Sequence, residues 1–175
     1  VNFQYASSAS VYGPTQHFTE DGPLQPQSAY AWTKYLFDWF VSQNLDHFQI
    51  IVQGFRYFNV YGHNGENHKG DMASPYTKFS NQAKDTGGIT LFENSENYKR
   101  DFVCVEDVCS VHEKMLNVDQ SGIYNVGTGS AVSFETVGRT IAKKHNADIN
   151  YIPMPDTLKN QYQEYTCANT NKLRS

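Results

Sequence analysis

Short apolar blocks alternate with polar segments along the chain, and glycine, proline or small polar residues bound each block. Residues 1–5 are apolar and β-prone and run into the small residues 6–10, which suits a buried strand that opens into a loop. Ser28 can cap a helix through about Gln43, and residues 50–55 are strand-like again. Strand, helix and strand in this order predict a right-handed parallel crossover and an α/β sheet.

The pattern changes after Gly62, where residues 63–70 are polar and rich in glycine and predict a loop. Asp107 is a candidate cap for a later helix, and apolar residues such as Trp32 and Trp39 suggest a packing face on the first helix. The remaining elements that we expect are helices over 72–84, 107–117 and 133–145, and strands over 89–92, 102–105, 123–126 and 149–152.

A glycine-rich turn of the G-x-G-x-x-G type, which receives a pyrophosphate at a helix N-terminus, does not occur in this sequence. Residues 127–129 are the nearest candidate, but they lack the third glycine and lie late in the chain. We therefore expect an α/β fold that comprises the C-terminal part of a Rossmann-type doubly wound parallel sheet and a smaller α/β substrate-binding domain, with the N-terminal glycine-rich unit absent. Residues 1–62 are assigned to the cofactor domain and 63–175 mainly to the substrate domain, with segments of about 101–145 as candidates to return to the cofactor domain.

The composition excludes several function classes. A hydrophobic content of 39% and a charged content of 18% in 175 residues are ordinary for a globular chain and argue against disorder. The net charge is −4 and no basic stripe interleaves with aromatics, which argues against nucleic acid as a partner. Apolar runs are too short to span a membrane, and no signal peptide is visible. Three cysteines without metal-ligand spacing indicate reduced thiols in a cytoplasmic protein and no metal site.

Tyr30 and Lys34 form a Y-x-x-x-K motif that can carry acid–base chemistry. Spacing of four residues places both side chains on one helix face, with Cβ atoms about 6 Å apart. An ammonium beside a phenol favours the phenolate and lowers a tyrosine pKa from about 10. Such a tyrosine can take the proton of an alcohol as hydride leaves its carbon. Taken alone, the motif also fits a surface tyrosine and a solvated lysine.

Ser8 precedes this motif at the mouth of the first predicted strand, where its hydroxyl can bond the same substrate oxygen as the tyrosine. The order Ser8, Tyr30, Lys34 resembles the short-chain dehydrogenases. Four segments resemble the extended, sugar-nucleotide branch, the NAD-dependent epimerase/dehydratase family: S-S-A-S-V-Y-G at 7–13, R-Y-F-N-V-Y-G at 56–62, R-D-F-V at 100–103 and Y-N-V-G-T-G at 124–129.

Further segments are similar to the ADP-L-glycero-D-manno-heptose 6-epimerase family within that branch. They are H-K-G-x-M-A-S at 68–74, L-F-E-N-S-E-N-Y-K-R-D at 91–101 and P-M-P-D at 153–156 with Y-Q at 162–163. The general segments are shared with UDP-galactose epimerases and dehydratases, but the 68–74 loop is not. The resemblance therefore extends along the whole chain.

The resemblance implies a role for each matching residue. Ser8, Tyr30, Lys34 and Lys69 would be catalytic, and Lys69 would act as a second base beside Tyr30; composition alone would favour a solvated lysine there. Tyr30, Lys34, Val60 and Lys69 would contact the cofactor. The residues implied in substrate binding are Asn59, Asp71, Lys78, Phe92, Glu93, Asn94, Ser95, Arg100 and Tyr162. The family pattern has serine at Asp71 and histidine at Lys78, so these two contacts are open.

The function implied is inversion at C6 of ADP-D-glycero-D-manno-heptose by transient oxidation with bound NADP, or alternatively NAD, in a cytoplasmic homo-oligomer, a pentamer by resemblance. This would serve the synthesis of the lipopolysaccharide core. Another sugar-nucleotide epimerase or a dehydratase of the same branch is one alternative, although residues 9–10 are Ala-Ser where a dehydratase usually carries an acidic pair. A non-catalytic sugar-nucleotide sensor on the same fold is another, and retention of all four catalytic residues argues against it.

Overall fold

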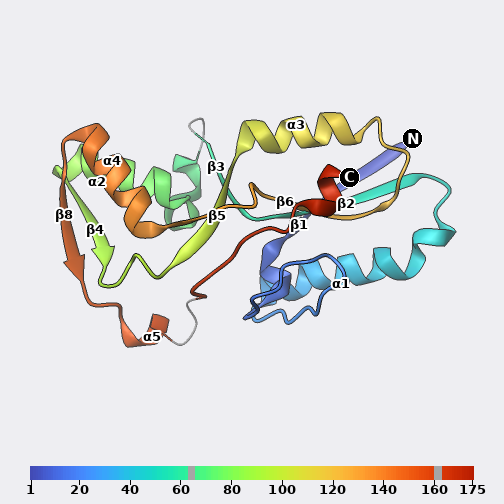
Figure 1. The fold of residues 1–175 in the computed structure, drawn as a ribbon, viewed down its shortest axis with the longest axis horizontal. Helices are drawn as coiled ribbons and strands as arrows, with labels where there is room; N and C mark the ends of the chain where they lie inside the picture. Colours follow the sequence, from blue (N-terminus) through green and yellow to red (C-terminus); the bar gives the residue numbers. More distant parts are fainter. Residues whose placement is uncertain (63–65, 160–162) are drawn as a thin grey trace.

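The computed structural model describes residues 1–62, 66–159 and 163–175, without the side chains of Asn67, Asp71 and Lys159. Two lobes lie along the long axis of the molecule (Figure 1). One lobe contains the strands β1, β2 and β6 between the helices α1 and α3, and the other contains β4 and β8 with α2 and α4. No helix within the described ranges is long and apolar enough to cross a membrane.

The first lobe is a parallel sheet of order β1-β2-β6, formed by Asn2–Ser8, Ile51–Tyr57 and Gly122–Val126. Helix α1 (Ala29–Asn44) connects β1 to β2, as the sequence predicts, and Ser28 caps it by accepting a hydrogen bond from the Ala31 amide. Helix α3 (Val105–Met115) covers the other face of the sheet (Figure 1). The predicted parallel α/β class is therefore confirmed, and the carboxyl ends of β1 and β2 meet at one edge.

The second lobe is held together by a separate hydrophobic core. Helices α2 (Pro75–Thr86) and α4 (Phe134–His145) pack on the parallel pair β4 (Gly88–Phe92) and β8 (Asp148–Ile152). A small sheet of order β3-β5-β7 joins the lobes. Its strands are Asn59–Tyr61, Lys99–Cys104 and Ala131–Ser133, and the short helical segments are η1 (Ala9–Tyr12), η2 (Leu45–His47), η3 (Asn67–Met72), α5 (Asp156–Lys159) and α6 (Asn171–Arg174). The domain boundary after residue 62 stays a prediction.

Two helix starts differ from the sequence prediction. The second helix was expected from Met72 but begins at Pro75, because Ser74 caps it and a proline is well tolerated in the first turn. The third was expected from an Asp107 cap but begins at Val105, directly after β5. Asp107 lies in its first turn, where a carboxylate is favourable near the positive end of the helix dipole.

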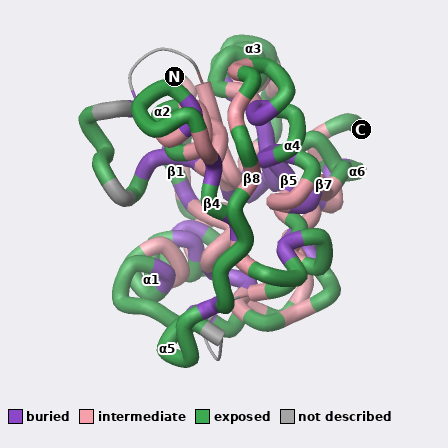
Figure 2. Tube along the Cα trace, turned by 90° about the vertical axis from the view of Figure 1, so that its left-hand side faces the viewer, coloured by how far each residue is buried: buried purple, intermediate pink, exposed green. Residues whose placement is uncertain are grey.

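The apolar side chains of α1 differ from the packing face that the periodicity suggests. Trp32, Leu36, Trp39 and Phe40 are each about half exposed (49–54%), so they form no part of the core of this chain. Figure 2 shows α1 as mostly exposed. The periodicity identified one helix face correctly, but it could not show whether this chain covers that face.

Candidate functional site

Three of the predicted catalytic residues lie at or near the carboxyl edge of the first sheet: Ser8, Tyr30 and Lys34. Ser8 ends β1 opposite Tyr57 of β2, and its Oγ accepts a hydrogen bond from the Ser10 amide (3.2 Å). Segment η1 then packs against α1. In open α/β sheets, ligands bind outside the carboxyl ends of the strands, so Ser8 lies where a ligand is expected.

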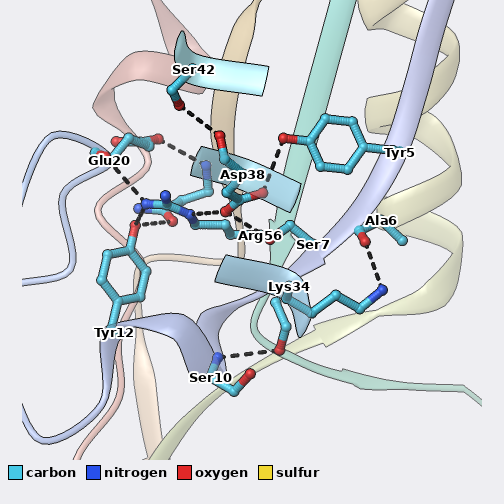
Figure 3. Close-up of polar contacts among 12 residues, drawn as sticks. Tyr5, Ala6, Ser7, Ser10, Tyr12, Glu20, Lys34, Asp38, Ser42 and Arg56 are labelled. Atoms are coloured by element: carbon cyan, nitrogen blue, oxygen red, sulfur yellow. Dashed lines mark hydrogen bonds and ion pairs between the residues drawn. The ribbon is translucent and has the colours of Figure 1, made fainter. Parts of the chain in front are cut away.

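Tyr30 and Lys34 lie on the face of α1 that turns toward this edge. Lys34 Nζ is 5.7 Å from the centroid of the Tyr30 ring and donates to the Ala6 carbonyl (2.9 Å). Tyr30 lies in the first turn of α1 and is 57% exposed, so this residue is accessible to a ligand. An ammonium has three donors, and the bond to Ala6 uses one of them. Figure 3 shows Lys34 reaching from α1 to β1.

A nicotinamide dinucleotide fits these groups. An exposed phenol and a lysine with donors to spare suit ribose hydroxyls and a reacting alcohol, and both lie at the sheet edge where such ligands bind. Val60 lies in β3 and packs against the cluster that contains Phe55. Its side chain therefore contributes apolar surface beside the sheet.

Lys69 lies in η3 and is paired with a carboxylate. Its Nζ is 3.2 Å from Glu66 Oε1, and the Lys69 side chain is 43% exposed. Burial opposes ionisation of Glu66, but hydrogen bonds from Ser74, Thr77 and Lys69 outweigh it and lower the pKa of Glu66 to about 2. In the described part of the chain, no hydrogen bond or ion pair joins Lys69 to Tyr30.

A cavity of about 520 Å³ opens in the second lobe, between α2, β4 and β5. Among the residues predicted to bind substrate, Asn59, Lys78, Phe92, Ser95 and Arg100 line it. Glu93 and Asn94 lie in the turn after β4 and are not among its lining residues. Tyr162 and the side chain of Asp71 lie outside the described residues.

Polar groups of the cavity are held in place by neighbouring side chains. Ser95 is 2% exposed, and its hydroxyl donates to Glu135 Oε2 (2.6 Å), which leaves its oxygen as an acceptor for a ligand. Burial opposes ionisation of Glu135, but hydrogen bonds from Ser95, Tyr151 and Arg139 lower its pKa. The Arg100 guanidinium lies 5.5 Å from the centroid of the Phe134 ring. This cation–π contact orients a group that can bind phosphate oxygens.

Several lining residues were not foreseen from the sequence. Helix α2 contributes Pro75, Lys78, Phe79 and Gln82 to the cavity, at spacings of three, four and seven. That spacing marks one helix face, so the periodicity could have identified Phe79 and Gln82. The other unforeseen residues are Ala73, Thr90, Leu91, Tyr98, Phe134 and Ile152.

Comparison with known proteins connects this geometry to a family. Residues 1–127 match the NAD dependent epimerase/dehydratase family. This match covers most of the chain, and the chain belongs to that family.

Solved structures agree in fold. ADP-L-glycero-D-manno-heptose-6-epimerase from Helicobacter pylori superposes with a TM-score of 0.83 at 31% identity, over 98% of this chain and 52% of that one. UDP-glucose 4-epimerase from Thermus thermophilus, solved in complex with NAD, gives 0.81 at 27% identity, over 99% and 57%. UDP-N-acetylglucosamine 4-epimerase from Methanobrevibacter ruminantium gives 0.88 at 20% identity, over 99% and 55%, and supports the fold alone. The chain spans about half the length of the relatives that it matches.

Proposed function

We propose that this member of the epimerase/dehydratase family is a sugar-nucleotide epimerase, and that its substrate is ADP-D-glycero-D-manno-heptose, inverted at C6. The observation that carries the proposal is the bond from Lys34 to the Ala6 carbonyl, which holds the Tyr30–Lys34 face of α1 against the end of β1 at Ser8. The proposal concerns the whole protein, working as a homo-oligomer in the cytoplasm.

Three observations favour epimerisation of this substrate over other reactions of the family. Residues 9 and 10 are alanine and serine, so the acidic pair that a dehydratase usually carries after its serine is missing from the sequence. The 31% identity to the Helicobacter pylori ADP-heptose epimerase and the H-K-G-x-M-A-S loop at 68–74 favour the heptose substrate.

The residues of the sheet edge would move the proton of the reacting hydroxyl. Tyr30 would accept that proton as hydride leaves the carbon, and Ser8 would donate a hydrogen bond to the same oxygen. To accept that proton Tyr30 would have to be the phenolate, whose negative charge the Lys34 ammonium would stabilise. A nicotinamide dinucleotide, NADP or alternatively NAD, held by Lys34 at its ribose, would supply the reversible hydride acceptor.

The cavity of the second lobe would hold the nucleotide. Arg100 and Lys78 line it and suit a diphosphate, and Phe92 offers an apolar surface for a base. Asn59 also lines this cavity, and it follows β2 at the sheet edge. The substrate would therefore extend from the cavity past Asn59 to Tyr30.

Lys69 would serve the second orientation of the carbonyl intermediate. Lys69 donates to Glu66 in the structure, and because an ammonium has three donors it could keep this bond while it donates a proton to the substrate. Lys69→Met should abolish epimerisation, while the variant loaded with reduced nicotinamide should still reduce an aldehyde analogue of the intermediate to the corresponding alcohol. Normal epimerisation by this variant would mean that Lys69 is a surface lysine without a catalytic role.

The main test is Tyr30→Phe in the full-length protein. We expect turnover of ADP-heptose to fall by about 10²-fold or more while the nicotinamide remains bound. Tyr35→Phe, the same substitution at the next tyrosine of α1, is the control and should keep turnover. Near-normal turnover of Tyr30→Phe would contradict the catalytic role. Turnover of UDP-glucose but not ADP-heptose by the unmodified protein would contradict the heptose assignment alone.

A further inference from the structure

A buried ion pair lies on the same face of α1 as the proposed catalytic residues. Asp38 follows Lys34 by four residues and Tyr30 by eight, a spacing that keeps all three on one side of the helix. Asp38 is 1% exposed and Arg56 of β2 is 2% exposed, and Arg56 Nε lies 2.8 Å from Asp38 Oδ2. This almost fully buried pair therefore lies about two turns along α1 from Tyr30, on the same side of the helix.

Asp38 also binds β1, the strand that ends at Ser8. The Tyr5 hydroxyl donates to Asp38 Oδ1 (3.0 Å) and the Ser7 hydroxyl donates to Oδ2 (2.9 Å). Burial, followed by the charge of Asp38, raises the pKa of Tyr5, which keeps its hydroxyl a donor. One turn earlier, Lys34 binds the Ala6 carbonyl. Helix α1 is thus fixed to three consecutive residues of β1 immediately before Ser8 (Figure 3).

Arg56 binds the segment on the other side of Ser8. Its NH1 group donates to the Tyr12 hydroxyl (3.1 Å) and to the Glu20 carbonyl (3.2 Å). Tyr12 ends η1, which begins directly after Ser8, and its hydroxyl in turn donates to Asn125 Oδ1 (2.7 Å). The chain is therefore fixed both before and after Ser8 by one ion pair.

We infer that the Asp38–Arg56 pair is a positioning device, which sets the register of the Tyr30–Lys34 face of α1 against Ser8. The inference rests on the proposed function, since it assigns the pair to the proton-transfer geometry of that site. A buried ion pair is a weak source of net stability compared with apolar packing, whereas its directional hydrogen bonds fix the relative placement of two elements. Neither residue touches the substrate or the cofactor in this scheme.

The test is a double-mutant cycle between Asp38→Asn and Tyr30→Phe in the full-length protein. Asp38→Asn alone should lower kcat by about 10- to 100-fold, because small misplacements of catalytic groups are costly, and should leave KM within about threefold. In the Tyr30→Phe background it should lower kcat by less than about threefold, because the group that it positions is gone. An equal loss in both backgrounds would overturn the inference, and so would an unchanged kcat of the single variant.

Gln53→Leu is the matched control for a general loss of stability. Gln53 is also fully buried on β2, but its amide binds the carbonyls of Met115, Val118 and Gln120 on the side of the sheet away from α1. Gln53→Leu should lower the Tm of the protein and leave kcat within about twofold of the parent value. A loss of kcat equal to that of Asp38→Asn would show that any buried polar residue of the sheet matters equally, and would overturn the inference.

Milder variants apply if Asp38→Asn does not fold. Ser7→Ala and Tyr5→Phe each remove one donor to Asp38 and should lower kcat by about three- to tenfold, again only while Tyr30 is present. Unchanged kcat in both would overturn the positioning role. If the proposed function is wrong, Tyr30→Phe will turn over normally, with or without a substitution at Asp38. That result distinguishes failure of the proposed function from failure of the positioning role.

Discussion

Two buried carboxylates, Asp38 and Asp101, are held in different ways. Asp38 is 1% exposed and its partners are side chains, including the cation Arg56. Asp101 is 0% exposed and accepts hydrogen bonds from three backbone amides and one hydroxyl. Those donors are the amides of Thr128, Gly129 and Ala168 and the Thr128 hydroxyl, at 2.6 to 3.0 Å.

The difference separates two tasks. Side-chain partners on β1 and β2 let Asp38 of α1 fix these three elements relative to one another. Amide partners let Asp101 fix the course of the main chain, here the turn after β6 and the C-terminal segment beside β5. The same residue type therefore orients a helix in one lobe and shapes loops at the junction with the other.

The largest effect is expected from Arg56→Met. This variant leaves the Asp38 carboxylate buried with only two hydroxyl donors, and we expect a loss of about 4 kcal/mol in the free energy of unfolding. The double variant Asp38→Leu with Arg56→Met should recover at least about 2 kcal/mol, because it removes both charges. Urea denaturation measures both values. No recovery in the double variant would mean that the charges themselves are not the source of the loss.

Asp101→Asn should have the next largest effect. An amide nitrogen would replace one carboxylate oxygen and face two donors, and we expect a loss of about 3 kcal/mol in the same measurement. A second substitution should not restore the lost free energy of unfolding, because the partners of Asp101 are mainly backbone amides and include no charged side chain among those described. Asp148→Asn, at an exposed position of β8, is the control. A loss below about 1 kcal/mol would show that the turn can rearrange around the amide.

The comparison also shows what the sequence can and cannot predict. The Tyr30–Lys34 face followed from helical spacing, and the first strand–helix–strand unit followed from apolar blocks, because both depend on local periodicity. The partnership of Asp38 with Arg56 joins residues 18 positions apart through a parallel crossover, and the contacts of Asp101 span 27 and 67 positions. Such contacts are set by tertiary packing. The pairing of Lys69 with Glu66 is local, but a polar loop has no periodicity that would indicate it.

Glu66 extends the comparison to a carboxylate at the edge of a lobe. Because folding lowers its pKa from 4.5 to about 2, folding favours the deprotonated form. The stabilisation is therefore complete above about pH 4.5 and is lost as the pH falls toward 2. We expect it to amount to roughly 2 kcal/mol, reduced by solvent around the half-exposed Lys69.

The measurement compares unfolding free energies of the parent protein and Glu66→Gln between pH 2 and pH 6. The difference should grow as the pH rises through this range and then level off. Thr77→Val removes one donor to Glu66 and should shrink the difference. A difference that does not change with pH would mean that the Glu66 contacts do not persist in solution.

The smallest effect is expected from Arg100→Met. This variant tests whether Asp101 influences the proposed nucleotide cavity through Arg100, its neighbour on β5. Arg100 lines the cavity, whereas Asp101 is directed to the turn at 127–129, as adjacent residues of a strand should be. Loss of a guanidinium that binds a diphosphate should raise KM for the sugar nucleotide by about tenfold, about 1.4 kcal/mol, with kcat within threefold. Lys99→Met, at the exposed neighbouring position, should change neither value.

If Asp101→Asn raises KM in the parent protein but not in the Arg100→Met background, the buried carboxylate acts on substrate affinity by orienting Arg100. If it raises KM equally in both backgrounds, its effect passes through the loops that it holds.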